Sequence, residues 1–256
     1  MKLLARLLIL SVPVAAQGII TTVAGADWVF TGDGRPAIEA PIGEPRGIFV
    51  SPDGSIYFID RDNRMVMKLD RQGILSVVAG NGNIGSVKVT STSARNTALP
   101  STLIDITGDR LGNLYISNAV TIQKIEPSGR ISTFAGGGTT RPGDGLPALS
   151  VVINPFNMAF DRGGSLYFTD FSNHCVRKVS ADGIITTVAG NGVDADSGDG
   201  GPAPQASLAF PDALNFDSAG NLYVACRNRI RKISAGGIIT TAVSAGARIA
   251  LVDSAD

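Results

Sequence analysis

Short apolar runs, separated by clusters of Gly, Pro, Asp, Asn and Ser, follow one another along most of this chain. Between residues 158 and 190 the runs read MAFD, SLYFTD, CVRKV and IITTVAG. Runs of this length that are rich in Ile, Val, Tyr, Phe and Thr are typical of β-strands. The residues between them, such as Arg162-Gly163-Gly164, are turn formers. No stretch keeps a long 3.6-residue period, so the pattern predicts strands and only minor helix.

The group of four runs returns at a fixed period. The segment GIITTVAG occurs at residues 18–25 and again, letter for letter, at 183–190. Variants of it begin at Gly73, Gly129 and Gly237. Four antiparallel strands repeated around an axis are the architecture of a β-propeller. The sequence therefore predicts an all-β propeller of four-stranded blades, with strands a to d running from the inside outward and GIITTVAG as strand d.

Counting the runs gives four full blades plus one extra outer strand. The blades close near residues 80, 136, 190 and 244, and the extra strand is the copy of GIITTVAG at 18–25. After Thr241 the pattern breaks, so residues 245–256 are interpreted as a degenerate or truncated tail. We interpret the chain as an incomplete six-bladed propeller, forming either an open arc or a strained four-bladed ring. An open blade would expose an unpaired edge, so self-association is expected.

A second motif joins strands b and c. Strand b ends in Asp and is followed by a short polar turn and an apolar-basic strand in LYFTDFSNHCVRKV (166–179) and YFIDRDNRMVMKL (57–69). LYVACRNRIRKI (222–233) matches more weakly. These stretches resemble NHL repeats, and three G-D-G-x-P-A loops resemble a bacterial, long-loop version of that family. The resemblance covers roughly residues 18 to 244 and implies a propeller used mainly as an interaction module.

The N-terminus, MKLLARLLILSVPVAAQ, has the form of a secretory signal peptide. Lys2 and Arg6 precede a short apolar run, and small residues before Gln17 suit cleavage after Ala16. We therefore expect residues 1–16 to be removed, residues 17–244 to form the propeller, and the protein to be secreted or periplasmic. The apolar run is shorter than the ~20 residues of a spanning helix, so no membrane span is expected after cleavage.

The net charge limits the classes of binding partner, and the cysteine content limits disulfide bonding. The 256 residues include 22 basic and 22 acidic side chains, giving a formal net charge of zero, so no nucleic acid partner is expected. The two cysteines, Cys175 and Cys226, are too few for a disulfide framework and fall at different places in the repeat.

The long d–a crossovers carry the first candidate site residues. Three of them contain G-D-G-x-P-A, with the acids Asp33, Asp144 and Asp199. One interpretation is a ring of carboxylates lining one mouth of the propeller, able to bind a cation or a hydroxylated ligand. The other is local: each Asp caps a one-turn helix that begins at Pro-Ala. Repetition in several blades favours the local interpretation.

Asp60, Asp170 and His174 are further ligand-binding candidates on the same face. The two acids end strand b and are expected to satisfy backbone N–H groups of the b–c turn. His174 is the single histidine, which rules out a His-rich zinc site. No G-x-S-x-G nucleophile elbow is present, so no catalytic residue is assigned.

The run DADSGDG (194–200) is the candidate metal site, through Asp194, Asp196 and Asp199. An EF-hand loop needs Gly at its sixth position and Glu at its twelfth, whereas this run has Asp199 and Gln205 there. No cofactor is therefore expected, with a looser calcium site as the alternative.

Together these observations predict a secreted, non-catalytic binding or scaffold propeller whose ligand is a protein or a glycan. The first alternative is a propeller enzyme, a calcium-dependent lactonase-like protein or a lyase, using acidic residues on the loop face. The second alternative is a truncated product without independent function.

Overall fold

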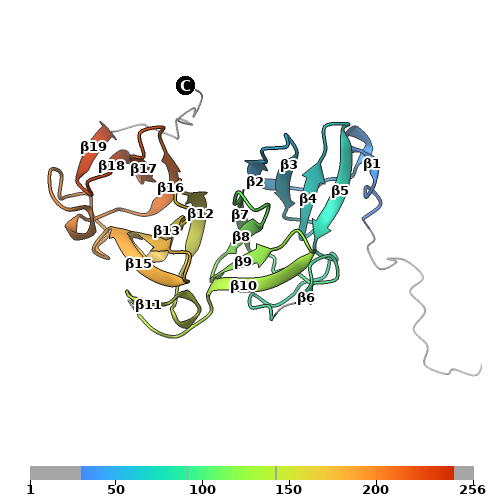
Figure 1. Cartoon of the computed structure of the whole chain (residues 1–256), viewed down its shortest axis with the longest axis horizontal. Coiled ribbons are helices and arrows are strands. Elements are labelled where there is room, and N and C mark those ends of the chain that lie inside the picture. Colours follow the sequence, from blue (N-terminus) through green and yellow to red (C-terminus); the bar gives the residue numbers. More distant parts are fainter. Residues whose placement is uncertain (1–29, 91, 142, 245–256) are drawn as a thin grey trace, which may run out of the picture.

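The computed structural model describes residues 30–90, 92–141 and 143–244. The predicted leader, the first copy of GIITTVAG and the tail after 244 lie outside these residues. Within them the chain forms four antiparallel sheets arranged around a common centre (Figure 1). The fold is an all-β propeller, as the repeat predicted.

Each blade is a four-stranded meander whose strands a to d follow the chain order. Blade 1 consists of β2 (Pro45–Val50), β3 (Ile56–Asp60), β4 (Met65–Leu69) and β5 (Ile74–Ala79). Blade 2 consists of β7 (Leu103–Gly108), β8 (Leu114–Asn118), β9 (Thr121–Ile125) and β10 (Arg130–Gly136). Blade 3 consists of β12 (Pro155–Phe160), β13 (Leu166–Asp170), β14 (Cys175–Val179) and β15 (Ile184–Ala189). Blade 4 consists of β16 (Pro211–Phe216), β17 (Leu222–Cys226), β18 (Arg229–Ile233) and β19 (Ile239–Ser244).

The crossovers add a short outer strand to the blade that follows them. These strands are β1 (Arg35–Pro36), β6 (Thr92–Ser93) and β11 (Leu146–Pro147), which pair with β5, β10 and β15. In blade 4 a single bridge between Pro202 and Ile238 takes their place. Each crossover thus covers part of the edge that strand d would otherwise leave unpaired.

The one-turn helices predicted at Pro-Ala are present as 3-10 turns, but the aspartates do not cap them. These turns are η1 (Ala37–Glu39), η2 (Ala148–Ser150) and η4 (Ala203–Gln205), and a fourth, η3 (Phe171–Asn173), follows strand b of blade 3. A proline occupies the N-cap position before η1, η2 and η4, and no side chain bonds to the turn there. The capping prediction was wrong because the three aspartates bond to strands c and d of their blade instead, through the backbone N–H of Val77 and the side chains of Arg177 and Arg231.

Blades pack face to face, and the apolar core lies between them. We call the face toward the following blade the trailing face and the face toward the preceding blade the leading face. Tyr115 on the trailing face of blade 2 packs edge-on against Phe160 of blade 3, with ring centroids 5.0 Å apart. Tyr167 repeats this contact with Phe216 of blade 4, at 4.9 Å. Aromatic pairs of this geometry stabilise a packed interface beyond their buried area.

The first and last glycines of the repeated segment differ in what they require. Gly183 opens strand d of blade 3 with φ +79°, and a Cβ there would meet nothing within 4 Å. Gly190 closes the segment with φ +92°, and a Cβ there would lie 2.4 Å from the carbonyl oxygen of His174. The last glycine is therefore needed for close approach to the b–c turn as well as for its backbone conformation.

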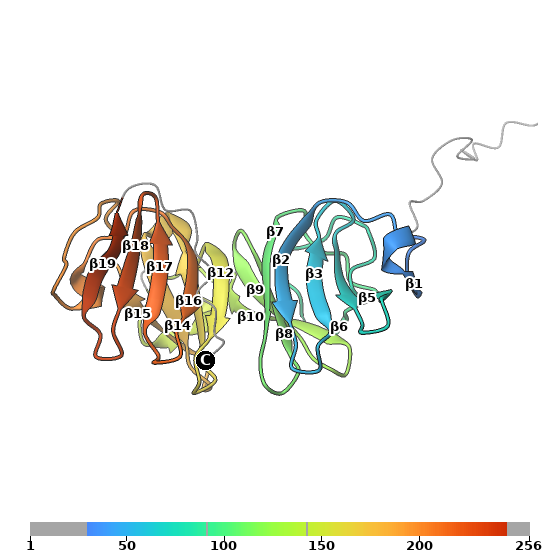
Figure 2. The same ribbon diagram turned by 90° about the horizontal axis from the view of Figure 1, so that it is seen from above.

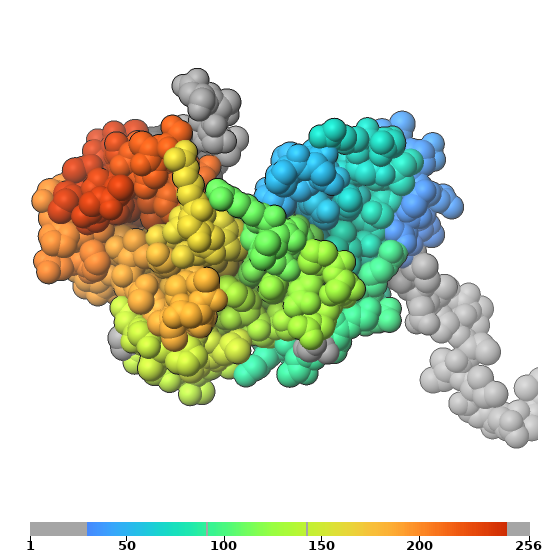
Figure 3. Space-filling view, viewed as in Figure 1, coloured from blue at the N-terminus to red at the C-terminus, as the bar shows by residue number. Residues whose placement is uncertain are grey.

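The arc is open between blade 1 and blade 4, and no strand pairing joins their sheets within the described residues (Figures 1 and 3). Figure 2 shows the connections gathered at the two ends of the strands. The helices of the described residues are too short to cross a membrane. The four blades are confirmed, while a six-bladed parent stays a prediction.

Candidate functional site

The b–c turns and the crossovers lie at one end of the strands, which we call the loop face. A cavity of about 470 Å³ opens there between blades 1, 2 and 3. Its lining comes from the residue before strand a, the start of strand a and the turn after strand b in these blades. It includes Arg46, Arg61, Thr102, Leu103, Ile104, Ala119, Asn154, Phe156, Phe171 and Ser172. We call this cavity the loop-face pocket.

One wall of the loop-face pocket is aromatic. Phe156 and Phe171 of blade 3 are stacked, with ring centroids 4.4 Å apart and planes at 16°. Phe171 also contacts Phe210 of blade 4, at 5.2 Å between centroids. The guanidinium of Arg227 lies over the Phe210 ring, 4.6 Å from its centroid. A row of rings therefore runs from the pocket to the next blade and ends in a cation–π contact.

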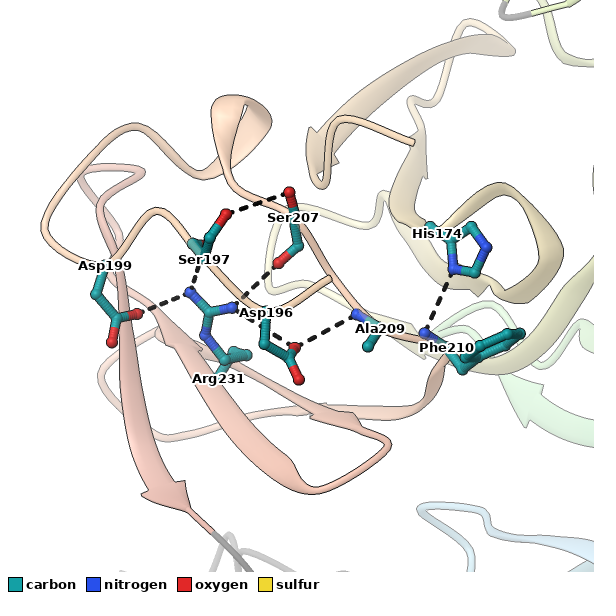
Figure 4. Close-up of polar contacts among 8 residues, drawn as sticks. All are labelled: His174, Asp196, Ser197, Asp199, Ser207, Ala209, Phe210 and Arg231. Carbon is teal, nitrogen blue, oxygen red and sulfur yellow. Dashed lines mark hydrogen bonds and ion pairs between the residues drawn. The ribbon is translucent and has the colours of Figure 1, made fainter. Parts of the chain in front are cut away.

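Phe210 has a strained backbone. Its φ is +46°, a left-handed conformation that is costly for a bulky residue and more so before a proline. The backbone N–H of Phe210 donates to Nδ1 of His174 at 3.4 Å, and the two rings meet edge to face (Figure 4). Strain of this kind persists only where the surroundings hold it, and it gathers at functional sites.

The opposite wall is basic and belongs to blade 1. Arg46 Nε donates to Glu44 Oε1 at 2.8 Å, and Arg61 Nη1 donates to Glu44 Oε2 at 3.2 Å. Both arginine side chains are about half exposed. Two guanidinium groups thus share one carboxylate, and each has more N–H donors than these bonds use.

The acids that end strand b stabilise the loops around the loop-face pocket through hydrogen bonds. Asp60 accepts hydrogen bonds from the backbone N–H of Gly43 (3.1 Å) and of Asn63 (3.1 Å). Asp170 accepts from the backbone N–H of Asn154 at 2.7 Å, and burial raises its pKa. The predicted bond to a backbone N–H of the b–c turn is confirmed for Asp60, whereas Asp170 contacts its b–c turn through the side chain of Asn173. They also hold the start of strand a, which positions the pocket.

The comparison with known proteins agrees with the NHL-like repeats seen in the sequence. The family model of the teneurin NHL domain matches residues 14–101. Teneurin-1 of Gallus gallus is 28% identical over 230 residues, which cover 80% of this chain and 8% of the teneurin. Teneurin-4 of Homo sapiens is 30% identical over 227 residues, which cover 78% of this chain and 8% of the teneurin. The chain contains an NHL-type β-propeller domain. It spans about 8% of the length of these relatives.

Solved structures share the fold of this NHL propeller. A streptogramin B lyase aligns with a TM-score of 0.54 and 16% identity, over 80% of this chain and 56% of the lyase. An auxiliary nutrient binding protein from Bacteroides ovatus aligns with a TM-score of 0.57 and 18% identity, over 77% of this chain and 48% of that protein. At such identities the likeness concerns the fold alone.

The three G-D-G-x-P-A aspartates of the NHL propeller are not brought together. They lie on the outer edges of blades 1, 3 and 4. Asp33 accepts from the backbone N–H of Val77 at 2.8 Å, and its other oxygen pairs with Arg95. Asp144 accepts from Arg177 at 2.8 Å. The carboxylates therefore do not form a ring at the mouth, and a ligand role for any of them stays a prediction.

Each of the three calcium candidates pairs with an arginine. Asp194 lies 3.2 Å from Arg227, while Asp196 and Asp199 lie 3.9 Å and 2.7 Å from the guanidinium of the fully buried Arg231 (Figure 4). A positive charge thus stands where these acids would otherwise meet a cation. No group of three or more His, Cys, Asp or Glu side chains placed to hold a metal occurs within residues 30–90, 92–141 and 143–244.

Asp105 is a functional candidate that the sequence analysis missed. It is buried in β7, and burial raises its pKa to about 7. Its Oδ2 accepts from the backbone N–H of Met158 (2.8 Å) and from Asn157 Nδ2 (3.0 Å). Asn157 Oδ1 in turn accepts from the backbone N–H of Leu214 at 2.8 Å. A polar residue at the third position of strand a therefore bonds to the next blade, and the signal was the acid inside the apolar run LIDITG.

The same position borders the centre of the propeller. A cavity of about 720 Å³ is lined by strand a of all four blades, including Asp105 and Asn157.

Both cysteines are free thiols buried away from this cavity, in β14 and β17, and burial raises the pKa of each to about 12.

Proposed function

We propose that this NHL propeller is a non-catalytic binding module and that the loop-face pocket is its ligand site. The ligand we propose is a polypeptide segment that presents an apolar side chain beside a carboxylate. The observation that carries the proposal is one pocket of about 470 Å³ with a stacked phenylalanine pair on one wall and an arginine pair on the other. The signal-like N-terminus supports the further proposal that the module works outside the cytoplasm.

The aromatic wall supplies the apolar part of the recognition. Phe156 and Phe171 are only partly buried, so their rings still have surface to cover. Leu103 and Ile104 add apolar lining from blade 2. Burial of a Leu-sized side chain against such a surface contributes about 2 kcal/mol.

The arginine wall supplies orientation. Guanidinium groups bind carboxylates through paired, charge-assisted hydrogen bonds. Glu44 accepts hydrogen bonds from some of the N–H donors of each guanidinium group, and a ligand carboxylate would accept from the remaining donors of Arg46 and Arg61. Because these side chains are half exposed, we expect them to affect specificity and association rate more than total affinity.

The site is built on strand ends, which favours binding without rearrangement. Asp60, Asp170 and Asn154 fix the b–c turns and the starts of strand a through backbone hydrogen bonds. A preorganised site loses less conformational entropy when a ligand binds.

The binding role is favoured over the enzymatic alternative by the placement of the acids. A lactonase-like or lyase site would need carboxylates that converge on one point. Asp33, Asp144 and Asp199 instead lie on three separate blades, each bonded to an arginine.

The test is selection of binders from a random twelve-residue peptide library, followed by fluorescence anisotropy with the selected peptides. We expect Phe171→Ala to weaken binding at least tenfold, and Arg61→Gln to weaken binding of peptides with an acidic residue. The control is Leu111→Ala, an exposed apolar residue in an a–b turn at the other end of the strands. Selected peptides that bind all three variants equally would refute the loop-face site, and a library without binders would refute a polypeptide ligand.

A further inference from the structure

The two ends of the arc present sheet faces that no blade covers among the described residues. One is the leading face of blade 1, where Ile48 and Val50 lie on β2. The other is the trailing face of blade 4, where Tyr223, Ala225 and Ile230 lie on β17 and β18. We call these two surfaces the free leading face and the free trailing face.

The free leading face is apolar and exposed where its equivalents are buried. Ile48 is 69% exposed, whereas the residues at its position in the next three blades, Ile106, Met158 and Leu214, are 2%, 5% and 6% exposed. Val50, on the same side of β2, is 61% exposed. In blades 2 to 4 the preceding blade supplies the cover that blade 1 lacks.

The free trailing face likewise lacks the cover that a neighbouring blade gives the other trailing faces. Ile230 pairs with Ala225 in the sheet and is only partly buried. The residues at its position in blades 1 to 3, Val66, Ile122 and Val176, are fully buried by the following blade.

The aromatic residue of this face also lacks its usual contact. Tyr223 occupies the position at which Tyr115 and Tyr167 pack edge-on against the next blade, and Lys232 lies over its ring at 5.6 Å. Lys178 lies over Tyr167 in the same way within a complete junction. The free trailing face therefore has the side chains of a blade junction without the partner blade.

The two free faces are the two halves of one interface. Each junction inside the chain joins a trailing face to a leading face, and the ends leave one of each kind. In the single chain both faces contribute to the lining of the central cavity of about 720 Å³, the leading face through Ile48 and Val50 and the trailing face through Tyr223 and Ile230. Figure 3 shows the gap between blade 1 and blade 4. That space keeps them apart.

We infer that the protein forms a head-to-tail dimer in which two arcs close into one ring of eight blades. Blade 1 of each copy packs on blade 4 of the other, so Val50 takes the place opposite Tyr223 that Phe160 and Phe216 hold within the chain. Eight blades lie within the range that propellers adopt, and two-fold closure leaves no free face. This dimer is independent of the loop-face pocket, whose residues lie at the strand ends.

The mass of the purified chain over a range of concentrations tests the dimer, by analytical ultracentrifugation. We expect a dimer that dissociates on dilution. Ile48→Asp and Ile230→Asp are each expected to weaken it at least a hundredfold, because every junction then contains one changed face. The control is Ile38→Asp, the same substitution at a residue that is 97% exposed on the crossover of blade 1. It should leave the dimer intact.

Mixing the two variants identifies the orientation. Ile48→Asp copies keep a normal trailing face and Ile230→Asp copies keep a normal leading face, so the mixture forms one intact junction and regains dimers. A dimer that survives Ile230→Asp but not Ile48→Asp would overturn head-to-tail packing, since the leading faces would then pair with each other. A monomeric wild type, or an open-ended series of larger species, would overturn the closed ring. Far-UV circular dichroism confirms that each variant is folded.

Discussion

The buried carboxyl group of Asp105 makes a sharp prediction about pH and stability. Its native pKa is about 7 because burial penalises the charged form, against an ordinary value of 3.8. Between these two values the folded protein holds a proton that the unfolded chain has released. The free energy of unfolding must therefore fall as the pH rises from about 4 to about 7. A pKa difference of this size between the folded and unfolded states corresponds to about 4 kcal/mol in the free energy of unfolding.

The substitution Asp105→Asn removes the titration and keeps the hydrogen bonds. Both bonds from blade 3, from the Met158 N–H and from Asn157 Nδ2, go to a single oxygen of Asp105. The amide oxygen of Asn can accept both of them in the same position. We expect the variant to match the wild type near pH 4 and to be more stable by up to about 4 kcal/mol near pH 8.

Urea unfolding followed by far-UV circular dichroism between pH 4 and pH 8 measures this difference. Glu39→Gln is the control, because it removes one negative charge from an exposed turn. That variant should keep the wild-type dependence on pH. If Asp105→Asn also kept it, burial of this carboxyl group would not be what links stability to pH.

Two further predictions concern the repeat itself. Gly190→Ala should lower the free energy of unfolding by about 3 kcal/mol, because a Cβ there meets the b–c turn at 2.4 Å. Gly183→Ala should cost only about 1 kcal/mol, because a Cβ there meets nothing and only the positive φ opposes it. Equal losses of stability in thermal melting would contradict this. Arg231→Met should cost about 2 kcal/mol, because the carbonyl groups of Ser197 and Ser207 lose their buried donor, while the half-exposed Asp199 can be solvated by water. Arg110→Met, in an exposed turn, is its control, and a comparable loss there in urea unfolding would show that burial is not the cause.

The blades could be predicted from the sequence because their strands depend on local pattern. The second copy of GIITTVAG contains β15, and the turn glycine Gly183 comes directly before that strand. The direction of the G-D-G-x-P-A aspartates could not be predicted in the same way. Asp33 bonds to a backbone group 44 residues further along the chain, and that contact exists only once β1 has paired with β5.

The loop-face pocket shows the same limit. Phe156, Phe171 and Phe210 occupy three different places in the repeat, at the start of strand a, after strand b and before the next strand a. No sequence spacing connects them, so the sequence analysis did not single them out. They meet because adjacent blades bring these three places to one end of the strands.

The sequence by itself determined the strands, the blade period and the alternation of apolar and polar positions, since these follow from turn chemistry and from the two-residue period of a strand. Only the tertiary structure decided which polar groups meet. The buried Arg231 became paired with the half-exposed Asp199, Arg46 and Arg61 became neighbours of an aromatic wall, and Ile48 was left exposed at the end of the arc. These outcomes depend on contacts between blades, which form between residues far apart in the chain, and on how many blades are present to cover one another.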